Sequence, residues 1–211
     1  MSTMSYIHTS LPAPAGSPLL FLFHGTGGDE NQFRSLGRSL MPGAGIVAPR
    51  GDVFENGAAR FFRRRAEGVY DMGDLALRTR KMADFVRAHR DAAKPSSVLG
   101  LGYSNGANIL ASVIFHDPTL FDAAVLMHPL IPFAPIIDGD LAGKKILVTA
   151  GGHDPISPEH MTHRLEAHLR ATKANVTITW HGGGHELRPS EIEAARQFFA
   201  PYAARPKERN A

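Results

Sequence analysis

A serine set between two glycines is the residue of this 211-residue sequence with the plainest chemical role. Gly102-Tyr103-Ser104-Asn105-Gly106 follows an apolar run at 98–101 and precedes a segment of helical character at 105–116. In a sharp strand-to-helix turn, glycines two residues on either side let strand and helix approach and leave the serine hydroxyl exposed. This context indicates a nucleophile, with a glycine-rich turn and a helix-capping serine as the alternative.

A serine hydroxyl needs a histidine base, and the histidine needs a carboxylate to hold its tautomer. His185 follows a β-branched run at 176–180, and Asp154 follows an apolar run at 146–150. Together with Ser104 they stand in the chain order serine, acid, histidine, which nucleophile-elbow hydrolases share. We therefore predict a catalytic triad of Ser104, Asp154 and His185.

Other residues could fill two of these roles. His181 is the next choice as base, and a turn before a helix is a simpler explanation of Asp154 that remains open. Asp138 and Asp140 are possible acids too, but a solvated turn explains their presence equally simply. The alternatives are His181, His153 and His128 for the base and Asp138 and Asp140 for the acid.

Attack on a carbonyl creates an oxyanion, which two backbone N–H groups usually bind. One donor is the residue after the nucleophile, here Asn105, and the other comes from the loop after an early strand. That loop is His24-Gly25-Thr26-Gly27-Gly28, and we assign the second donor to Thr26. His24 is expected to hold this loop in place rather than to act as a base.

Short apolar runs alternate with helix-spaced segments along the chain, as in α/β proteins. Apolar runs without alternation predict parallel strands buried on both faces, with right-handed helical crossovers covering both sides of the sheet. We expect one domain over 1–211, with an N-terminal segment at 1–18 and a flexible tail at 203–211. The predicted strands are 19–23, 46–48, 98–101, 123–127, 146–150 and 176–180, and the predicted helices begin near Asp29, Leu75, Asn105, Pro158 and Ser190.

Composition excludes several other classes of protein. The hydrophobic fraction of 43% and charged fraction of 20% are those of a folded, soluble protein. The net charge is +3, and the excess of basic residues is concentrated at 60–65 and in the tail. A nucleic-acid binder usually has a broader basic face. Absence of cysteine removes disulfides, thiolate metal sites and a cysteine nucleophile. With no signal peptide and no stretch near ~20 apolar residues, we expect a cytoplasmic protein without a membrane span.

The motifs together resemble the phospholipase/carboxylesterase family of α/β hydrolases, which includes acyl-protein thioesterases and small bacterial carboxylesterases. The resemblance implies an α/β-hydrolase fold without a separate cap domain, no metal or cofactor, often a homodimer, and an acyl-enzyme mechanism on esters or thioesters. Asn105 stands where thioesterase members commonly carry glutamine, which favours small-molecule esters over lipidated proteins. The resemblance covers about 19–202 and rests on 22–30, 102–108, 154–158 and 183–186, with 60–71 similar to a bacterial carboxylesterase branch.

The arginine-rich segment 60–65 follows the predicted strand that ends near Pro49, so it should emerge on the catalytic side of the sheet. Arg63 or Arg64 could then bind a carboxylate or phosphate of the substrate, because a guanidinium suits bidentate pairing. Structural salt bridges are an equally good explanation of the segment. Their acidic partners would be Glu67, Asp71 and Asp74.

A protein of another class could also have these motifs, because a fold does not guarantee an activity. The rival is a catalytically silent hydrolase-fold protein that binds a small ligand or a partner. A complete triad favours the enzyme. Within the enzymes, the lack of cysteine argues against a dienelactone hydrolase and leaves ester against thioester hydrolysis open.

Overall fold

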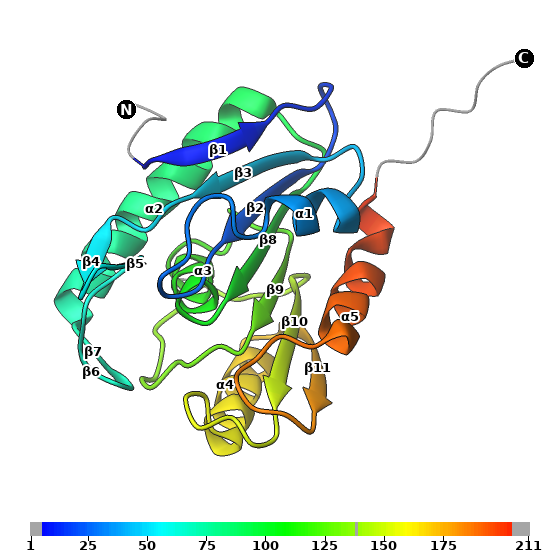
Figure 1. The fold of residues 1–211 in the computed structure, drawn as a ribbon. Helices are drawn as coiled ribbons and strands as arrows, with labels where there is room; N and C mark the ends of the chain where they lie inside the picture. The colour runs from blue at the N-terminus through cyan, green and yellow to red at the C-terminus, as the bar shows by residue number, and fades with distance from the viewer. Residues whose placement is uncertain (1–5, 138, 204–211) are drawn as a thin grey trace, which may run out of the picture.

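The fold is built on a seven-stranded sheet, seen in the computed structural model, which describes residues 6–137 and 139–203 (Figure 1). The strand order is β1-β3-β2-β8-β9-β10-β11, and every neighbouring pair is parallel except β1 with β3. This is the predicted α/β class. The strands are β1 (His8–Leu11), β2 (Leu19–Phe23), β3 (Gly45–Pro49), β8 (Val98–Tyr103), β9 (Ala123–Met127), β10 (Lys145–Gly151) and β11 (Asn175–His181).

Helices cover both faces of the sheet, and no separate cap domain covers its carboxyl edge (Figure 1). Phe21 packs into the core on one face, whereas its neighbours Leu20 and Leu22 pack into the core on the other. Alternate residues of a strand point to opposite faces, so a strand buried on both sides must be apolar throughout. The helices on the Phe21 face are α2 (Met72–Ala93), α3 (Asn105–His116) and α4 (Glu159–Ala171); those on the other are α1 (Arg34–Leu40) and α5 (Pro189–Phe199).

Two regions differ from the sequence-based expectation. The N-terminal segment contains strand β1, which pairs only at the sheet edge and is only partly buried, so it lacks an apolar run. The connection at 50–73 contains two hairpins, the first of which turns at Asn56-Gly57 with both φ angles positive, as tight hairpins require. The hairpins are β4 (Val53–Glu55) with β5 (Ala58–Arg60) and β6 (Arg64–Ala66) with β7 (Val69–Tyr70). Of the predicted tail, 204–211 lies outside the described residues.

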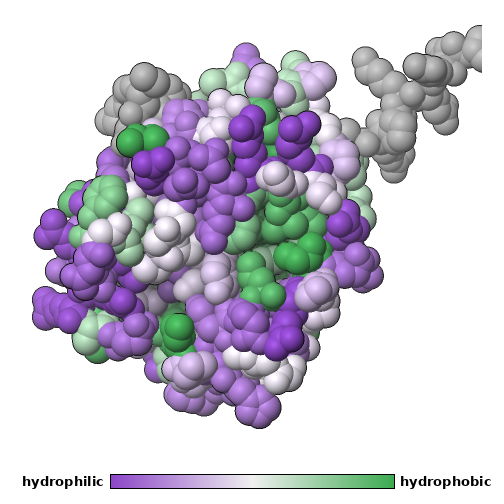
Figure 2. All heavy atoms as spheres, viewed as in Figure 1, coloured by the Kyte–Doolittle hydropathy of each residue, from purple (hydrophilic) through white to green (hydrophobic). Residues whose placement is uncertain are grey.

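The surface is mostly polar on the face shown in Figure 2, and apolar side chains gather between α1 and α5. Leu36, Ile192 and Phe198 belong to this partly buried set, which packs against the core below. No helix within the described residues has both the length and the apolar character needed to cross a bilayer.

Gly106 marks the closest approach of helix α3 to the sheet. A Cβ at this position would lie 2.2 Å from the carbonyl oxygen of Phe23, so an alanine forces backbone to move. Gly106→Ala should lower the free energy of unfolding by at least about 3 kcal/mol, measured by urea denaturation. Gly73→Ala is the control, because its Cβ would meet nothing closer than Asp71 Oδ1 at 3.5 Å. Equal stability of the two variants would contradict this packing.

Candidate active site

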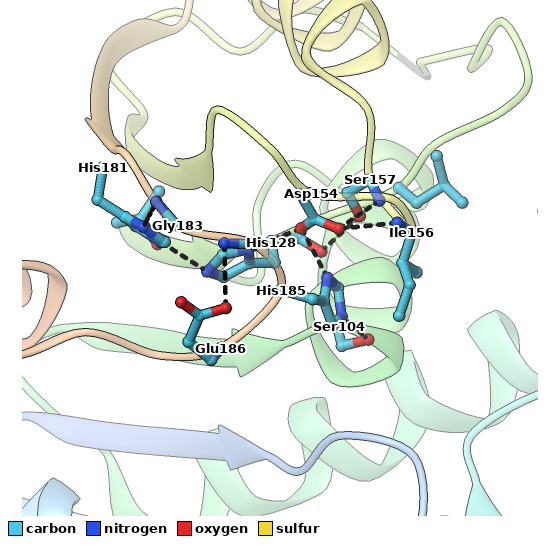
Figure 3. A network of polar contacts seen from close by, with 12 residues as sticks. Ser104, His128, Asp154, Ile156, Ser157, His181, Gly183, His185 and Glu186 are labelled. Carbon is cyan, nitrogen blue, oxygen red and sulfur yellow. Dashed lines mark hydrogen bonds and ion pairs between the residues drawn. The ribbon is translucent and has the colours of Figure 1, made fainter.

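Ser104, His185 and Asp154 meet above the carboxyl edge of the sheet, where the loops after β8, β11 and β10 converge (Figure 3). The Oγ atom of Ser104 lies 2.8 Å from Nε2 of His185. Nδ1 of His185 lies 2.7 Å from Oδ2 of Asp154. The structure therefore brings the three predicted triad residues into one hydrogen-bonded chain.

Ser104 occupies a strained turn between β8 and α3. Its φ of 52° and ψ of −117° are unfavourable for a residue with a Cβ, and such strain is commonly stored at functional sites. The turn is held because the Ser104 N–H donates to the Met127 carbonyl at 2.8 Å and Asn108 N–H donates to the Ser104 carbonyl at 3.0 Å. The elbow thus presents the hydroxyl at a fixed position.

Asp154 is a buried, ionised acceptor. Its Oδ1 accepts the backbone N–H groups of Ile156 at 2.8 Å and Ser157 at 2.9 Å. Burial acts to raise the pKa of Asp154, but hydrogen bonds from Ser157 N–H, His128 and His185 outweigh it and lower the pKa below its usual range. An ionised Asp154 accepts from Nδ1–H of His185, which leaves Nε2 free to accept the Ser104 proton.

Tyr103 also stabilises the loop that contains His185. The Tyr103 hydroxyl donates to the His185 carbonyl at 2.7 Å, and the two rings lie 5.5 Å apart. Because Tyr103 directly precedes Ser104, this hydrogen bond links the strand-to-helix turn to the loop that holds His185.

The alternative residues lie elsewhere or have other partners. His153 is exposed, with Nδ1 3.2 Å from the Gly182 carbonyl. Asp140 pairs with Lys173 at 2.8 Å. Asp138 lies outside the described residues. His128 lies near the triad and contacts Asp154, and His181 contacts His128, whereas the hydroxyl of Ser104 contacts His185; His128 and His181 belong to a second cluster described below.

A cavity of about 280 Å³ opens beside Ser104, and both predicted oxyanion residues, Thr26 and Asn105, line it. Asn105 begins α3, where backbone N–H groups have no partner within the helix. His24 holds the Thr26 loop: its Nε2 accepts from Gly51 N–H at 2.9 Å, so its Nδ1–H donates to the Gly25 carbonyl at 2.7 Å. This is the anchoring role expected of His24.

Of the four arginines in the segment 60–65, Arg60 and Arg64 line the cavity, and Arg63 and Arg65 do not. Arg64 lines the cavity, and its guanidinium pairs with Glu55 at 2.9 Å and with Glu67. Arg63 is exposed, and it is not among the lining residues; its backbone N–H donates to Asp74 at 2.7 Å. Of the two residues predicted to bind an anion, only Arg64 therefore lies at the site.

Arg60 reaches the same cavity, although sequence reasoning did not single it out. Its side chain is buried, and Nη1 donates to the Thr26 hydroxyl at 2.8 Å. Tyr70 and Asn108 also line the cavity and are hydrogen-bonded to each other at 2.8 Å. Only the position of Arg60 within the arginine-rich run could have indicated it from the sequence.

Within the part of the chain that the structure describes, two groups of side chains are close enough to hold a metal ion: His128 with Asp154 and His185, and His128 with His181 and Glu191. In the first group, the ring nitrogens of His185 contact Ser104 and Asp154, and those of His128 contact Asp154 and Glu191. In the second, Gly183 N–H donates to Nδ1 of His181 at 3.0 Å, so Nε2 carries the proton and has no lone pair for a metal. The hydrogen bonds therefore favour proton-bearing clusters over metal sites.

A parallel sheet flanked by helices, a strained serine elbow and a base and acid on later loops define an α/β hydrolase. The model of the dienelactone hydrolase family matches residues 7–197, and the chain belongs to this family. The lack of cysteine, taken above as evidence against a dienelactone hydrolase, therefore does not exclude the chain from this family.

Relatives of this chain include proteins of closely similar fold. MhqD of Bacillus subtilis (strain 168) is 41% identical over 183 residues, covering 86% of this chain and 92% of the relative. The crystal structure of Atu2452, a protein of unknown function from Agrobacterium tumefaciens str. C58, is 55% identical, with a TM-score of 0.92 over 96% of this chain and 100% of that one. The Bacillus cereus carboxylesterase is 36% identical, with a TM-score of 0.89 over 94% and 95% of the two chains.

Proposed function

We propose that the protein hydrolyses carboxylic esters or thioesters of small molecules through an acyl-enzyme on Ser104. The observation that carries this proposal is the 2.8 Å contact of Ser104 Oγ with His185 Nε2 at the edge of a cavity. The likeness to the Bacillus cereus carboxylesterase supports an ester as the substrate class.

In the proposed mechanism, His185 takes the Ser104 proton as the hydroxyl oxygen attacks the substrate carbonyl. The backbone N–H groups of Thr26 and Asn105 bind the oxyanion that forms. His185 then gives its proton to the leaving alcohol or thiol, and the acyl group stays on Ser104. In the second half of the reaction His185 activates water, which releases the acid and restores the serine.

A panel of substrates tests this function. Purified protein should release the phenol from short-chain aryl esters. Comparison of short and long acyl chains, and of matched thioesters, defines the preference. Activity should fall in acid, because only a neutral imidazole acts as base. A folded protein that cleaves none of these esters and takes up no fluorophosphonate would favour the silent, ligand-binding alternative.

We further propose that Arg64 favours substrates with an anionic group. It lines the cavity, and its partner Glu67 is largely exposed, so a substrate carboxylate can displace this ion pair at little cost. A guanidinium in a partly buried site pairs well with a carboxylate.

Arg64→Gln should reduce kcat/KM for an anionic ester roughly tenfold and leave a neutral ester of the same size almost unchanged. Arg63→Gln is the matched control, because Arg63 is exposed and does not line the cavity. Equal losses on both esters would instead make Arg64 a structural member of the salt bridge to Glu55.

A further inference from the structure

A second histidine, His128, reaches Asp154 from a direction other than that of His185 (Figure 3). Its Nδ1 lies 2.9 Å from Oδ2 of Asp154, the oxygen that His185 also contacts. On the opposite side of the ring, Nε2 of His128 lies 3.0 Å from Oε1 of Glu191. The side chains of His128, Asp154 and Glu191 are fully buried. One imidazole therefore bridges two buried carboxyl groups.

Glu191 is held as a carboxylate. Its oxygens accept from the Thr149 hydroxyl at 2.5 Å and the Arg188 N–H at 2.7 Å. Burial acts to raise the pKa of Glu191, but hydrogen bonds from His128 and Thr149 outweigh it and lower the pKa. Its position in the first turn of α5 also favours a negative charge.

With carboxylates on both sides, each ring nitrogen of His128 must donate a proton. A neutral imidazole has only one N–H, so the ring is an imidazolium. Burial acts to lower the pKa of His128, but hydrogen bonds to Glu191 and Asp154 outweigh it and raise the pKa above its ordinary value. A buried cation between two buried anions satisfies the requirement that buried charges be paired.

The other groups facing His128 do not supply a competing charge. His181 lies with Nε2 3.2 Å from Glu191, and because its Nδ1 accepts from Gly183 it is a neutral donor. His185 is the neutral base of the triad at rest, and Tyr103 presents its ring edge-on at 5.9 Å. None of these three neighbours of His128 carries a positive charge, so His128 is the cation of the cluster.

His128 shares with Ser104 a positive φ angle, which is uncommon for a residue with a Cβ. Five described residues other than glycine have positive φ; three of them, Asn56, Lys94 and Lys173, are exposed. The remaining two are Ser104 at 52° and His128 at 51°. His128 is held there by its N–H, which donates to the Thr149 carbonyl at 2.9 Å, and by its carbonyl, which accepts from the Ser157 hydroxyl. Strain at a fully buried residue indicates a functional constraint.

We propose that His128 is a positioning residue of the catalytic centre, a fixed imidazolium that shares Asp154 Oδ2 with His185 while Glu191 balances its charge. The shared carboxylate oxygen then attracts a proton on His185 less strongly. His185 stays neutral, and so able to act as a base, at lower pH. When protonated during catalysis it is also the stronger acid toward the leaving group. The inference rests on the proposed function for its kinetic consequence alone.

The kinetic test uses variants that remove the cation. His128→Gln leaves Glu191 buried without a counter-charge, so the double variant His128→Gln/Glu191→Gln, which is neutral at both positions, accompanies it. In both, the acid limb of the kcat/KM profile for an aryl ester should move up by about one pH unit. His181→Gln removes a neutral donor of the same cluster and should leave the acid limb in place. An unchanged limb in a folded double variant would overturn the proposal.

A second readout does not depend on ester hydrolysis. Nitrogen-15 NMR of the histidine rings should show both His128 nitrogens protonated at pH 7, and Glu191→Gln should move the His128 titration to lower pH. The His185 ring should titrate at higher pH in the double variant. A neutral His128 at pH 7, or a titration unaffected by Glu191→Gln, would contradict the inference. If the protein lacks esterase activity but His128 is protonated, the proposed function is wrong, whereas the imidazolium bridge between Asp154 and Glu191 is supported.

Discussion

Ser104→Ala should lower kcat for a reactive aryl ester by about 10⁶-fold, the scale at which triads lose turnover without their nucleophile. In the proposed mechanism the hydroxyl forms the acyl-enzyme, and its loss leaves only the oxyanion donors and substrate binding to accelerate attack by water. The measurement is steady-state hydrolysis at enzyme concentrations high enough to detect the residual rate.

The fold and the cavity should survive this substitution, because the Ser104 backbone contacts persist and only one oxygen is removed. The circular dichroism spectrum and the melting temperature should therefore match those of the wild type. Ser112→Ala removes a buried hydroxyl two turns further along α3, which donates to the Asn108 carbonyl, and serves as the control with normal turnover. Wild-type turnover in Ser104→Ala would place the chemistry elsewhere.

Asp154→Asn should lower kcat by about 10⁴-fold. An amide at this position can donate an N–H to Nδ1 of His185 and so stabilise the tautomer in which Nε2 carries the hydrogen. That tautomer cannot accept the Ser104 proton. The loss should appear in kcat for ester hydrolysis and in the rate of serine phosphonylation.

Asp140→Asn is the matched control for the acid. Asp140 was one of the two alternative candidates in the sequence, and it is exposed and paired with Lys173. Its substitution should leave kcat unchanged. Reversal of the two results, with the larger loss in Asp140→Asn, would show that the acid was assigned to the wrong loop.

The sheet and its helices were largely predictable because burial on both faces forces each central strand to be apolar throughout. The run at Leu19–Phe23 shows this directly, since alternate residues enter the two cores. Strand β1 was not predictable in this way, because it pairs along one edge and is only partly buried. The hairpins in 50–73 depend on short turns, for which Asn56-Gly57 was an available signal.

The triad was predictable because chain order and strand ends place Ser104, Asp154 and His185 at one edge of a parallel sheet. The His128–Glu191 bridge was not, since one residue follows β9 and the other lies on α5, and only the folded packing joins them. A histidine directly after a wholly apolar strand was its sole sequence signal. Glu191 near the start of a predicted helix is typical of an exposed first-turn acid.

The arginine segment shows the same limit. Arg60 ends strand β5 of the first hairpin, Arg64 begins strand β6 of the second, and Arg63 lies in the connection between them. Arg60 and Arg64 reach the cavity, whereas Arg63 stays exposed. The sequence-based choice of Arg63 or Arg64 identified the segment, but only the folded positions of the strands and their connection separate the two residues.

Reaction with a fluorophosphonate tests the central claim, an activated Ser104, most directly. We predict that folded protein takes up one equivalent and that peptide mass mapping finds the adduct on Ser104, with no adduct in Ser104→Ala. Modification of another residue, or none in folded protein at neutral pH, would contradict the account.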